Sequence, residues 1–105
     1  MLFVILESPF AGDIVKNEAY AKLAMRDSLL RGEAPFASHL LYTQKGILDD
    51  SNLKEREMGI EAGLYIGSFA DMTVVYIDLG ISSGMQYGID RAKHENRKIV
   101  YRTIL

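Results

Sequence analysis

Two carboxylates follow apolar runs at positions where they could act on a bound ligand. Glu7 comes after the run Leu2–Leu6, and Asp78 comes after the run Met72–Ile77. Such a pair could serve as acid and base if the two groups lie at the separation found in glycosidases. Carboxylates are also common in loops, so the alternative is that Glu7 binds a sugar hydroxyl or caps a loop and Asp78 opens a turn.

A Gly/Ser loop follows the second of these strands. It holds Ser82, Ser83 and Gly84, and a helix is expected from about Met85 to Asn96. The first turn of a helix has free N–H groups and the positive end of the helix dipole. A buried parallel strand that leads into a helix N-terminus is therefore a common site for anionic or hydroxyl-rich ligands in α/β proteins.

Three further side chains are candidates for ligand contact. His39 could hydrogen-bond a phosphate or a base, although such a residue is more often a polar loop side chain. Phe10, next to Pro9, is the preferred residue for stacking on a base. Arg56 either faces the ligand or a subunit interface, or forms a surface ion pair of little energetic value. The other histidine, His94, is expected to be solvated, so no metal site is predicted.

Composition narrows the class of protein. The chain has 105 residues, 49% of them hydrophobic and 25% charged, which indicates one globular domain. A net charge of −2 argues against binding to a nucleic-acid polymer. The absence of cysteine excludes disulfides and thiolate metal sites and fits a cytoplasmic protein. The run Leu2–Leu6 is too short for a signal peptide or a membrane span, so no membrane association is expected.

Strands and helices alternate along the chain. Asp13 and Ser51 are expected to cap helices, and Gly32 to end the first helix. A stripe of Val15, Ala19, Leu23 and Leu30 should face the core. The predicted strands are Leu2–Leu6, Ala34–Ala37, Met72–Ile77 and Lys98–Arg102, and the predicted long helices are Asp13–Arg31, Lys54–Phe69 and Met85–Asn96.

This order predicts one domain over residues 1–105 with a three-layer α/β/α sandwich, in which a small, mostly parallel four-stranded sheet has a flavodoxin-like or Rossmann-like arrangement. Gly59 and Gly63 lie four residues apart inside the second long helix. They are expected to allow close packing against the sheet or a partner helix.

An ordered set of short motifs extends over essentially the whole chain. The set comprises Ser8-Pro9-Phe10-Ala11-Gly12 with Asn17 and Tyr20, Arg56-Glu57 with Gly59-Ile60 and Ala62-Gly63, Ala70-Asp71 before a strand, Ser83-Gly84-Met85 with Ile89 and Ala92, and Val100-Tyr101-Arg102. In order and spacing it resembles the nucleoside 2-deoxyribosyltransferase superfamily, in particular a small, often phage-encoded branch.

The chain departs from that family at one position. Active members carry a nucleophilic glutamate four residues after the loop glycine, and counting from Gly84 this position is Gly88. A covalent glycosyl intermediate needs a carboxylate near the sugar, and glycine has none. The resemblance therefore implies a module that binds and sequesters a nucleotide or a nucleotide-derived signal without cleaving it, as a phage anti-defence protein would. The alternative is an N-glycosidase or 2-deoxyribosyltransferase that uses Glu7 and Asp78.

The resemblance also implies a ligand site, no cofactor, and a neighbouring subunit that completes a shallow pocket. We therefore expect a homo-oligomer, at least a dimer, that binds a nucleoside or nucleotide. The predicted ligand-binding residues are Glu7, Ser8, Pro9, Phe10, Asn17, His39, Arg56, Asp78, Ser82, Ser83, Gly84, Met85 and Gly88.

Overall fold

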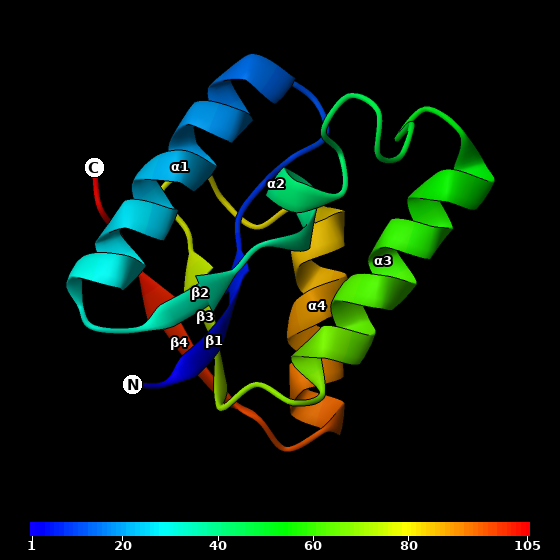
Figure 1. Ribbon diagram of the computed structural model, residues 1–105. Coiled ribbons are helices and arrows are strands. Elements are labelled where there is room, and N and C mark those ends of the chain that lie inside the picture. The colour runs from blue at the N-terminus through cyan, green and yellow to red at the C-terminus, as the bar shows by residue number, and fades with distance from the viewer.

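Eight elements follow one another in the computed structural model, which describes all residues from 1 to 105 (Figure 1). Their bounds are β1 Phe3–Glu7, α1 Ile14–Leu30, β2 Ala34–Phe36, α2 Ser38–Leu41, α3 Leu53–Gly67, β3 Met72–Tyr76, α4 Ser83–His94 and β4 Lys98–Arg102. No helix is long and apolar enough to cross a membrane.

The four strands form one sheet in the order β2-β1-β3-β4, and every pair is parallel. Helix α1 covers one face of the sheet, and α3 and α4 lie on the other (Figure 1). The predicted α/β fold with a layer of helices on each side is confirmed, and the sheet is wholly parallel. The carboxyl ends of β1 and β3 therefore meet at one edge, where parallel sheets bind ligands.

Alternation along the strands decides which side chains meet which helix. Val4 and Leu6 of β1 pack with Tyr20 and Ala24 of α1 in the larger core cluster. On the opposite face, Val75 of β3 packs with Met85 and Ile89 of α4. Because side chains alternate along a strand, Glu7 projects toward the α4 side, as Val75 does in the paired register.

Caps define the ends of the helices. Asp13 accepts a hydrogen bond from the Lys16 N–H at the start of α1, and Ser82 accepts one from Met85 at the start of α4. Gly32 follows α1 with a φ of +82°, as a helix-ending glycine does. The predicted cap of α3 at Ser51 is wrong by one residue, because the Asn52 side chain accepts from the N–H groups of Lys54 and Glu55.

The buried stripe of α1 is not the predicted one. Val15 and Leu30 are exposed, with 83% and 73% of their surfaces accessible. The buried positions of the helix are Asn17, Tyr20, Ala21, Ala24 and Ser28. These positions recur at helical spacing on another side of the helix than the predicted stripe, and they combine small side chains with the large ring of Tyr20.

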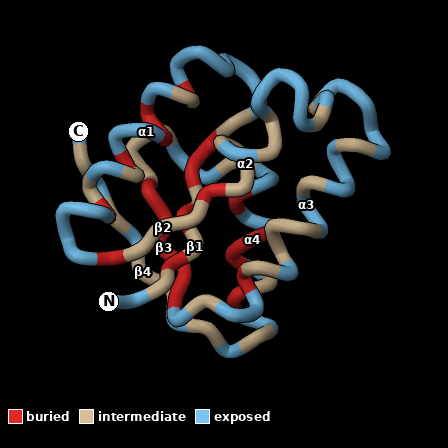
Figure 2. Tube along the Cα trace, viewed as in Figure 1, coloured by how far each residue is buried: buried red, intermediate tan, exposed pale blue.

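Helix α3 packs through its glycines. A Cβ at Gly63 would lie 2.7 Å from Ser38 Oγ on α2, and a Cβ at Gly67 would lie 3.4 Å from Ile5 on β1. The expected close packing on a helix is confirmed for Gly63, whose partner is α2. The other predicted glycine, Gly59, packs on Leu48 in the segment after α2. Gly67 is the buried residue of α3, and the rest of the helix is exposed or half-buried (Figure 2).

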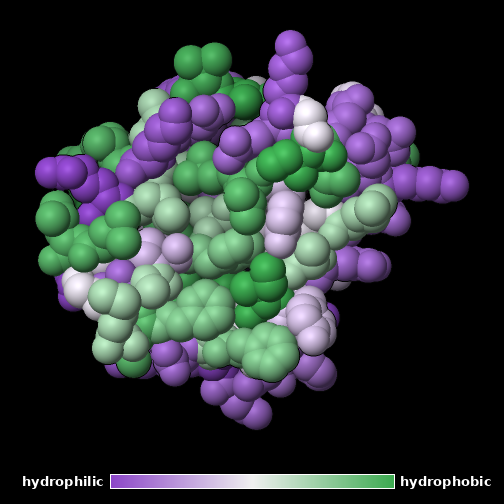
Figure 3. All heavy atoms as spheres, in the orientation of Figure 1, coloured by the Kyte–Doolittle hydropathy of each residue, from purple (hydrophilic) through white to green (hydrophobic).

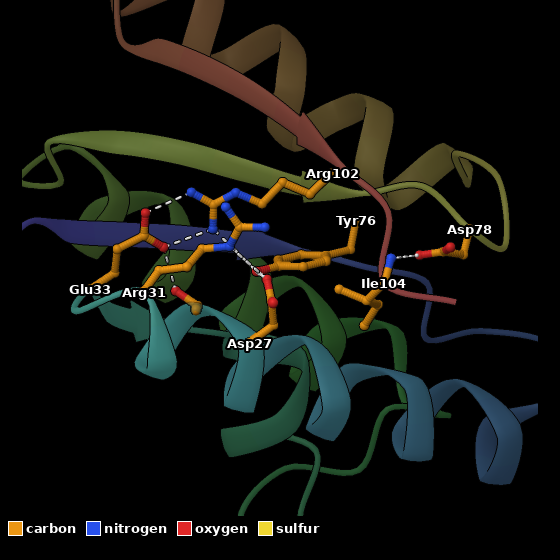
Figure 4. Close-up of polar contacts among 8 residues, drawn as sticks. Asp27, Arg31, Glu33, Tyr76, Asp78, Arg102 and Ile104 are labelled. Carbon is orange, nitrogen blue, oxygen red and sulfur yellow. Dashed lines mark hydrogen bonds and ion pairs between the residues drawn. The ribbon is translucent and has the colours of Figure 1, made fainter.

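A polar cluster lies at the side of the sheet covered by α1 (Figure 4). Arg102 of β4 forms an ion pair with Glu33, at 2.6 Å between Nη2 and Oε2, and donates to Tyr76. Glu33 also accepts from Ser28, and Tyr76 donates to Asp27. Both members of the ion pair are buried and further hydrogen-bonded, which is the condition for such a pair to be tolerated in a core.

Candidate functional site

A cleft of about 190 Å³ opens on the face of the sheet that carries α3 and α4. The loop after β1, helix α2, the inner side of α3, and the first turns of α4 form its walls. Gly59, Gly63, Gly67 and Gly88 line it and present no side chains. At each of these glycines a side chain of another segment lies close to the backbone, so the glycines let the walls of the cleft approach one another.

The carboxyl group of Glu7 lies in this cleft against Gly88. A Cβ at position 88 would stand 2.6 Å from the Glu7 Cδ and 3.0 Å from its Oε1, so no side chain larger than hydrogen fits there with Glu7 in place. The Glu7 carboxyl group therefore fills the space that the first carbon of a side chain at position 88 would need.

Burial raises the pKa of Glu7 to about 8, and the positive charge of Arg97 partly offsets that increase. No hydrogen bond contributes to the shift. At neutral pH the group is therefore a protonated carboxylic acid, able to donate a proton. A buried carboxyl group with a raised pKa, held in a cleft, is typical of a catalytic acid.

Ser8 and His39 form a hydrogen-bonded pair beside Glu7. Ser8 Oγ lies 2.7 Å from His39 Nε2, and both residues line the cleft. Burial lowers the pKa of His39 to about 4, so its imidazole is neutral at pH 7. The ring of Phe10 meets His39 edge to face, with the ring centroids 6.4 Å apart. Phe10 therefore lies on the cleft wall, as expected for a stacking residue.

Arg97 is a lining residue that sequence reasoning missed. Its Nε donates to Thr73 on β3, and its Nη1 donates to Glu95 at 2.6 Å. Only 7% of its side chain is exposed, and it places a positive charge near Glu7. A lone arginine in the turn between α4 and β4 gives no local sign of this role, because the role depends on how α4 packs on the sheet.

Ten of the predicted ligand-binding residues come together in this cleft: Glu7, Ser8, Phe10, His39, Arg56, Ser82, Ser83, Gly84, Met85 and Gly88. Pro9 does not line it. Asn17 does not line it either, and instead donates to the carbonyl oxygens of Phe10 and Ala11. Asn17 thus holds the loop after β1 in place.

The structure corrects the expected pairing of Glu7 with Asp78. Asp78 does not line the cleft. It accepts hydrogen bonds from Tyr20 on α1, at 2.6 Å, and from the N–H groups of Ile104 and Leu105. The bond from Tyr20 holds the pKa of Asp78 below its ordinary value. The two carboxylates therefore face opposite sides of the sheet and cannot act on one bond.

The loop before α4 offers backbone donors at the rim of the cleft. The Ser82 side chain caps the helix by accepting from the Met85 N–H. The N–H groups of Ser83 and Gly84, in the first turn, have no acceptor within the helix. They are therefore the groups that could meet an anionic part of a ligand. No cluster of three or more acidic, histidine or cysteine side chains is arranged to hold a metal ion.

We predict that stability depends on pH through Glu7 and His39 with opposite signs. Because the folded pKa of Glu7 is raised to about 8 from 4.5, its contribution is complete below pH 4.5 and is lost as pH rises through 8. Because the folded pKa of His39 is lowered to about 4 from 6.5, its contribution is complete above pH 6.5 and is lost as pH falls through 4.

Of these two contributions, only that of Glu7 changes above pH 6.5. The free energy of unfolding should therefore fall by up to about 1.4 kcal/mol per pH unit until Glu7 ionises. Urea unfolding between pH 6.5 and 8.5 measures this slope. Glu7→Gln should remove it, whereas Glu57→Gln, a change at an exposed position on α3, should keep it. Equal slopes in wild type and Glu7→Gln would contradict the prediction.

Comparison with known proteins places the fold. One solved structure with this architecture is a 2-deoxyribosyltransferase from the psychrotolerant bacterium Bacillus psychrosaccharolyticus, described as a biocatalyst for nucleoside synthesis. It superimposes with a TM-score of 0.67 and 18% sequence identity, over 96% of this chain and 72% of that one. At this identity the similarity shows a shared fold. No curated protein matches the chain. Residues 2–102 match a family described as a domain of unknown function (DUF7768), and the chain belongs to that family.

Proposed function

We propose that this protein cleaves the N-glycosidic bond of a nucleoside or nucleotide, with Glu7 as the acid that protonates the leaving base. The observation that carries this proposal is the position of the Glu7 carboxyl group, in the cleft and against Gly88. The shared fold with a nucleoside-processing transferase supports the class of ligand. This reverses the order of the two hypotheses drawn from the sequence, because an acid does stand beside position 88.

The protonation state of Glu7 suits this role. An N-glycosidic bond breaks more easily when the departing base receives a proton, and general acids with a pKa near the working pH serve best. With a pKa of about 8, Glu7 holds its proton at neutral pH and is still acidic enough to release it. Arg97 then stabilises the carboxylate that remains after the transfer.

The walls of the cleft suggest how the substrate lies. Phe10 offers an aromatic face for the base. Ser83 and Gly84 offer N–H groups for a phosphate or a sugar hydroxyl at the start of α4. The base would thus lie toward the loop after β1, and the sugar would lie between that loop and α4, above Glu7.

A second candidate function is capture of the nucleotide without cleavage. It is favoured by the same protonation state, since a neutral carboxylic acid does not attack the anomeric carbon. It is also favoured by the position of Asp78, which leaves Glu7 without the partner predicted from the sequence. Sequestration of a host signal nucleotide by a phage-encoded protein would be one setting for this function.

Incubation of the purified protein with a panel of nucleosides and nucleotides separates the two functions. Chromatography should detect free base in the supernatant if the bond is cleaved. If the protein only captures its ligand, heat denaturation should release the intact nucleotide and no base. Recovery of intact ligand from every member of the panel at catalytic protein concentration would refute the proposed cleavage.

We predict that the protein forms at least a dimer through α3. Met58 and Tyr65, seven residues apart on this helix, are exposed by 58% and 70%, and Phe69, just after the end of the helix, is exposed by 66%. Hydrophobic residues also spread over the middle of the surface in Figure 3, which shows this view of the molecule. A surface of this kind is typical of an interaction site.

Light scattering at micromolar concentration should therefore give at least twice the monomer mass of 11.8 kDa. Phe69→Glu should return the protein to a monomer, because a buried unpaired charge opposes association. Leu30→Glu, on the exposed side of α1, should leave the mass unchanged. A monomeric wild-type protein at this concentration would contradict the prediction.

A further inference from the structure

The hydrogen-bonded pair of Ser8 and His39 stands next to the proposed acid and has no role in the proposed function so far. Ser8 follows Glu7 directly in the chain, and its hydroxyl oxygen lies 2.7 Å from His39 Nε2. All three side chains line the same cleft. The Glu7 carboxyl group at the end of β1 and the pair formed by Ser8 and His39 of α2, all able to move a proton, therefore reach the same cleft.

We propose that His39, acting through the Ser8 hydroxyl, is the base that activates a water molecule, so that the cleft hydrolyses its substrate and does not transfer the sugar to a second base. This inference rests on the proposed N-glycosidic cleavage and adds the nucleophile to it. His39 acts through Ser8 and is a positioning residue, whereas Ser8 would touch the attacking water.

The protonation states on the two sides of the cleft are complementary. His39 is neutral above pH 4 and can accept a proton, and Glu7 is protonated below pH 8 and can donate one. Groups whose environments push their pKa values apart in this way form acid and base pairs in enzymes. Neutral His39 and protonated Glu7, the two forms that the reaction requires, are therefore present together between about pH 4 and about pH 8.

Other charged groups do not alter this pattern. Arg97, in the turn after α4, faces Glu7 and lowers its pKa in part. No charged group contributes to the pKa shift of His39, which arises from burial alone. The remaining titratable residues of the cleft lie on the segment after α2, on α3 and on α4, and they are Tyr42, Asp50, Glu55, Arg56 and Tyr87.

The proposed step balances in atoms and charge. The water oxygen bonds to the anomeric carbon as the bond from that carbon to the base nitrogen breaks. One water proton passes to Ser8 Oγ while the Ser8 hydroxyl proton passes to His39 Nε2. The base nitrogen takes the Glu7 proton. The products are the free base and the free sugar, and solvent restores the Glu7 proton and removes the proton from His39.

The test is the pH dependence of base release by wild type, Ser8→Ala and His39→Asn. Wild type should show a bell-shaped profile of kcat/KM with limits near pH 4 and pH 8, because this ratio reports the pKa values of the free protein. His39→Asn should lower kcat by about 100-fold with little change in KM and should lose the acid limb. Ser8→Ala should lower kcat similarly. His94→Asn, at an exposed position on α4, is the matched control and should keep the wild-type profile.

A second measurement follows the acceptor. With a labelled free base added to the reaction, hydrolysis should give no labelled nucleoside, and formation of labelled nucleoside would overturn the inference. An acid limb that persists in His39→Asn would overturn it as well. These outcomes require a wild-type protein that releases base. A wild type that releases none would instead refute the proposed function, and the inference with it.

Discussion

Glu7→Gln is expected to lower base release by about 10²-fold to 10⁴-fold, the usual contribution of a general acid. Glutamine has nearly the same shape as a protonated glutamic acid and also fits against Gly88. It cannot give a proton to the leaving base, so the loss should appear in kcat more than in KM. Base release from a nucleotide substrate at pH 7 measures the change, and circular dichroism confirms that the fold is retained.

Asp78→Asn is the control for this experiment. It alters the other carboxylate that the sequence suggested, and this residue lies on the α1 side of the sheet, bonded to Tyr20. We expect its turnover to match wild type, with a lower melting temperature because Ile104 and Leu105 lose a charged acceptor. Turnover retained in Glu7→Gln, or lost only in Asp78→Asn, would show that the acid has been assigned to the wrong residue.

Gly88→Ala is expected to differ in its effect on stability between two backgrounds. In the wild type, the new Cβ would stand 2.6 Å from the Glu7 Cδ, so the carboxyl group must move out of its place. Because this group is the far end of a flexible side chain, moving it costs less than overpacking a rigid core, but displacement of the acid should reduce base release. In a Glu7→Ala background the obstruction is gone, and the same substitution should stabilise α4 by about 1 kcal/mol.

Denaturant unfolding of the four proteins in this cycle gives the coupling energy between the two positions. Gly84→Ala serves as a control for the general effect of alanine in α4, because its Cβ would meet nothing closer than Ser82 Oγ at 4.0 Å. If Gly88→Ala changed the free energy of unfolding equally in both backgrounds, the two positions would not be in the contact described here.

Local patterns in the sequence were enough to predict most of the fold. The apolar runs of β1 and β3 indicated buried parallel strands, and Asp13 and Gly32 marked the ends of α1 through a side-chain oxygen and backbone freedom. The start of α4 lies two residues before the predicted one, with Ser82 as its cap. The buried side of α1 was predicted wrongly, because the large aliphatic residues of this helix lie on the side away from the sheet. Ala21 and Ala24 are completely buried beside Tyr20, while Val15 and Leu30 remain exposed.

The site was predictable in part. Chain order placed the loop after β1 and the start of α4 at the same sheet edge, so ten of the 27 residues that line the cleft could be named. The face of the sheet on which Asp78 lies could not be predicted, because a shift of one residue reverses the direction of a side chain at a strand end. Contact between Glu7 and Gly88, and the approach of Arg97, depend on packing between distant segments that no local pattern records.

The contact between Glu7 and Gly88 bears on how relatives of this protein are compared. Here the strand carries the acid and the helix carries glycine. In the reverse arrangement the helix would carry the acid, and the strand would carry a small residue that leaves room for it. The acid could therefore move from one element to the other during evolution without a change in the shape of the cleft. A survey that inspects only the aligned helix position would then miss an acid that the strand supplies to the same cleft.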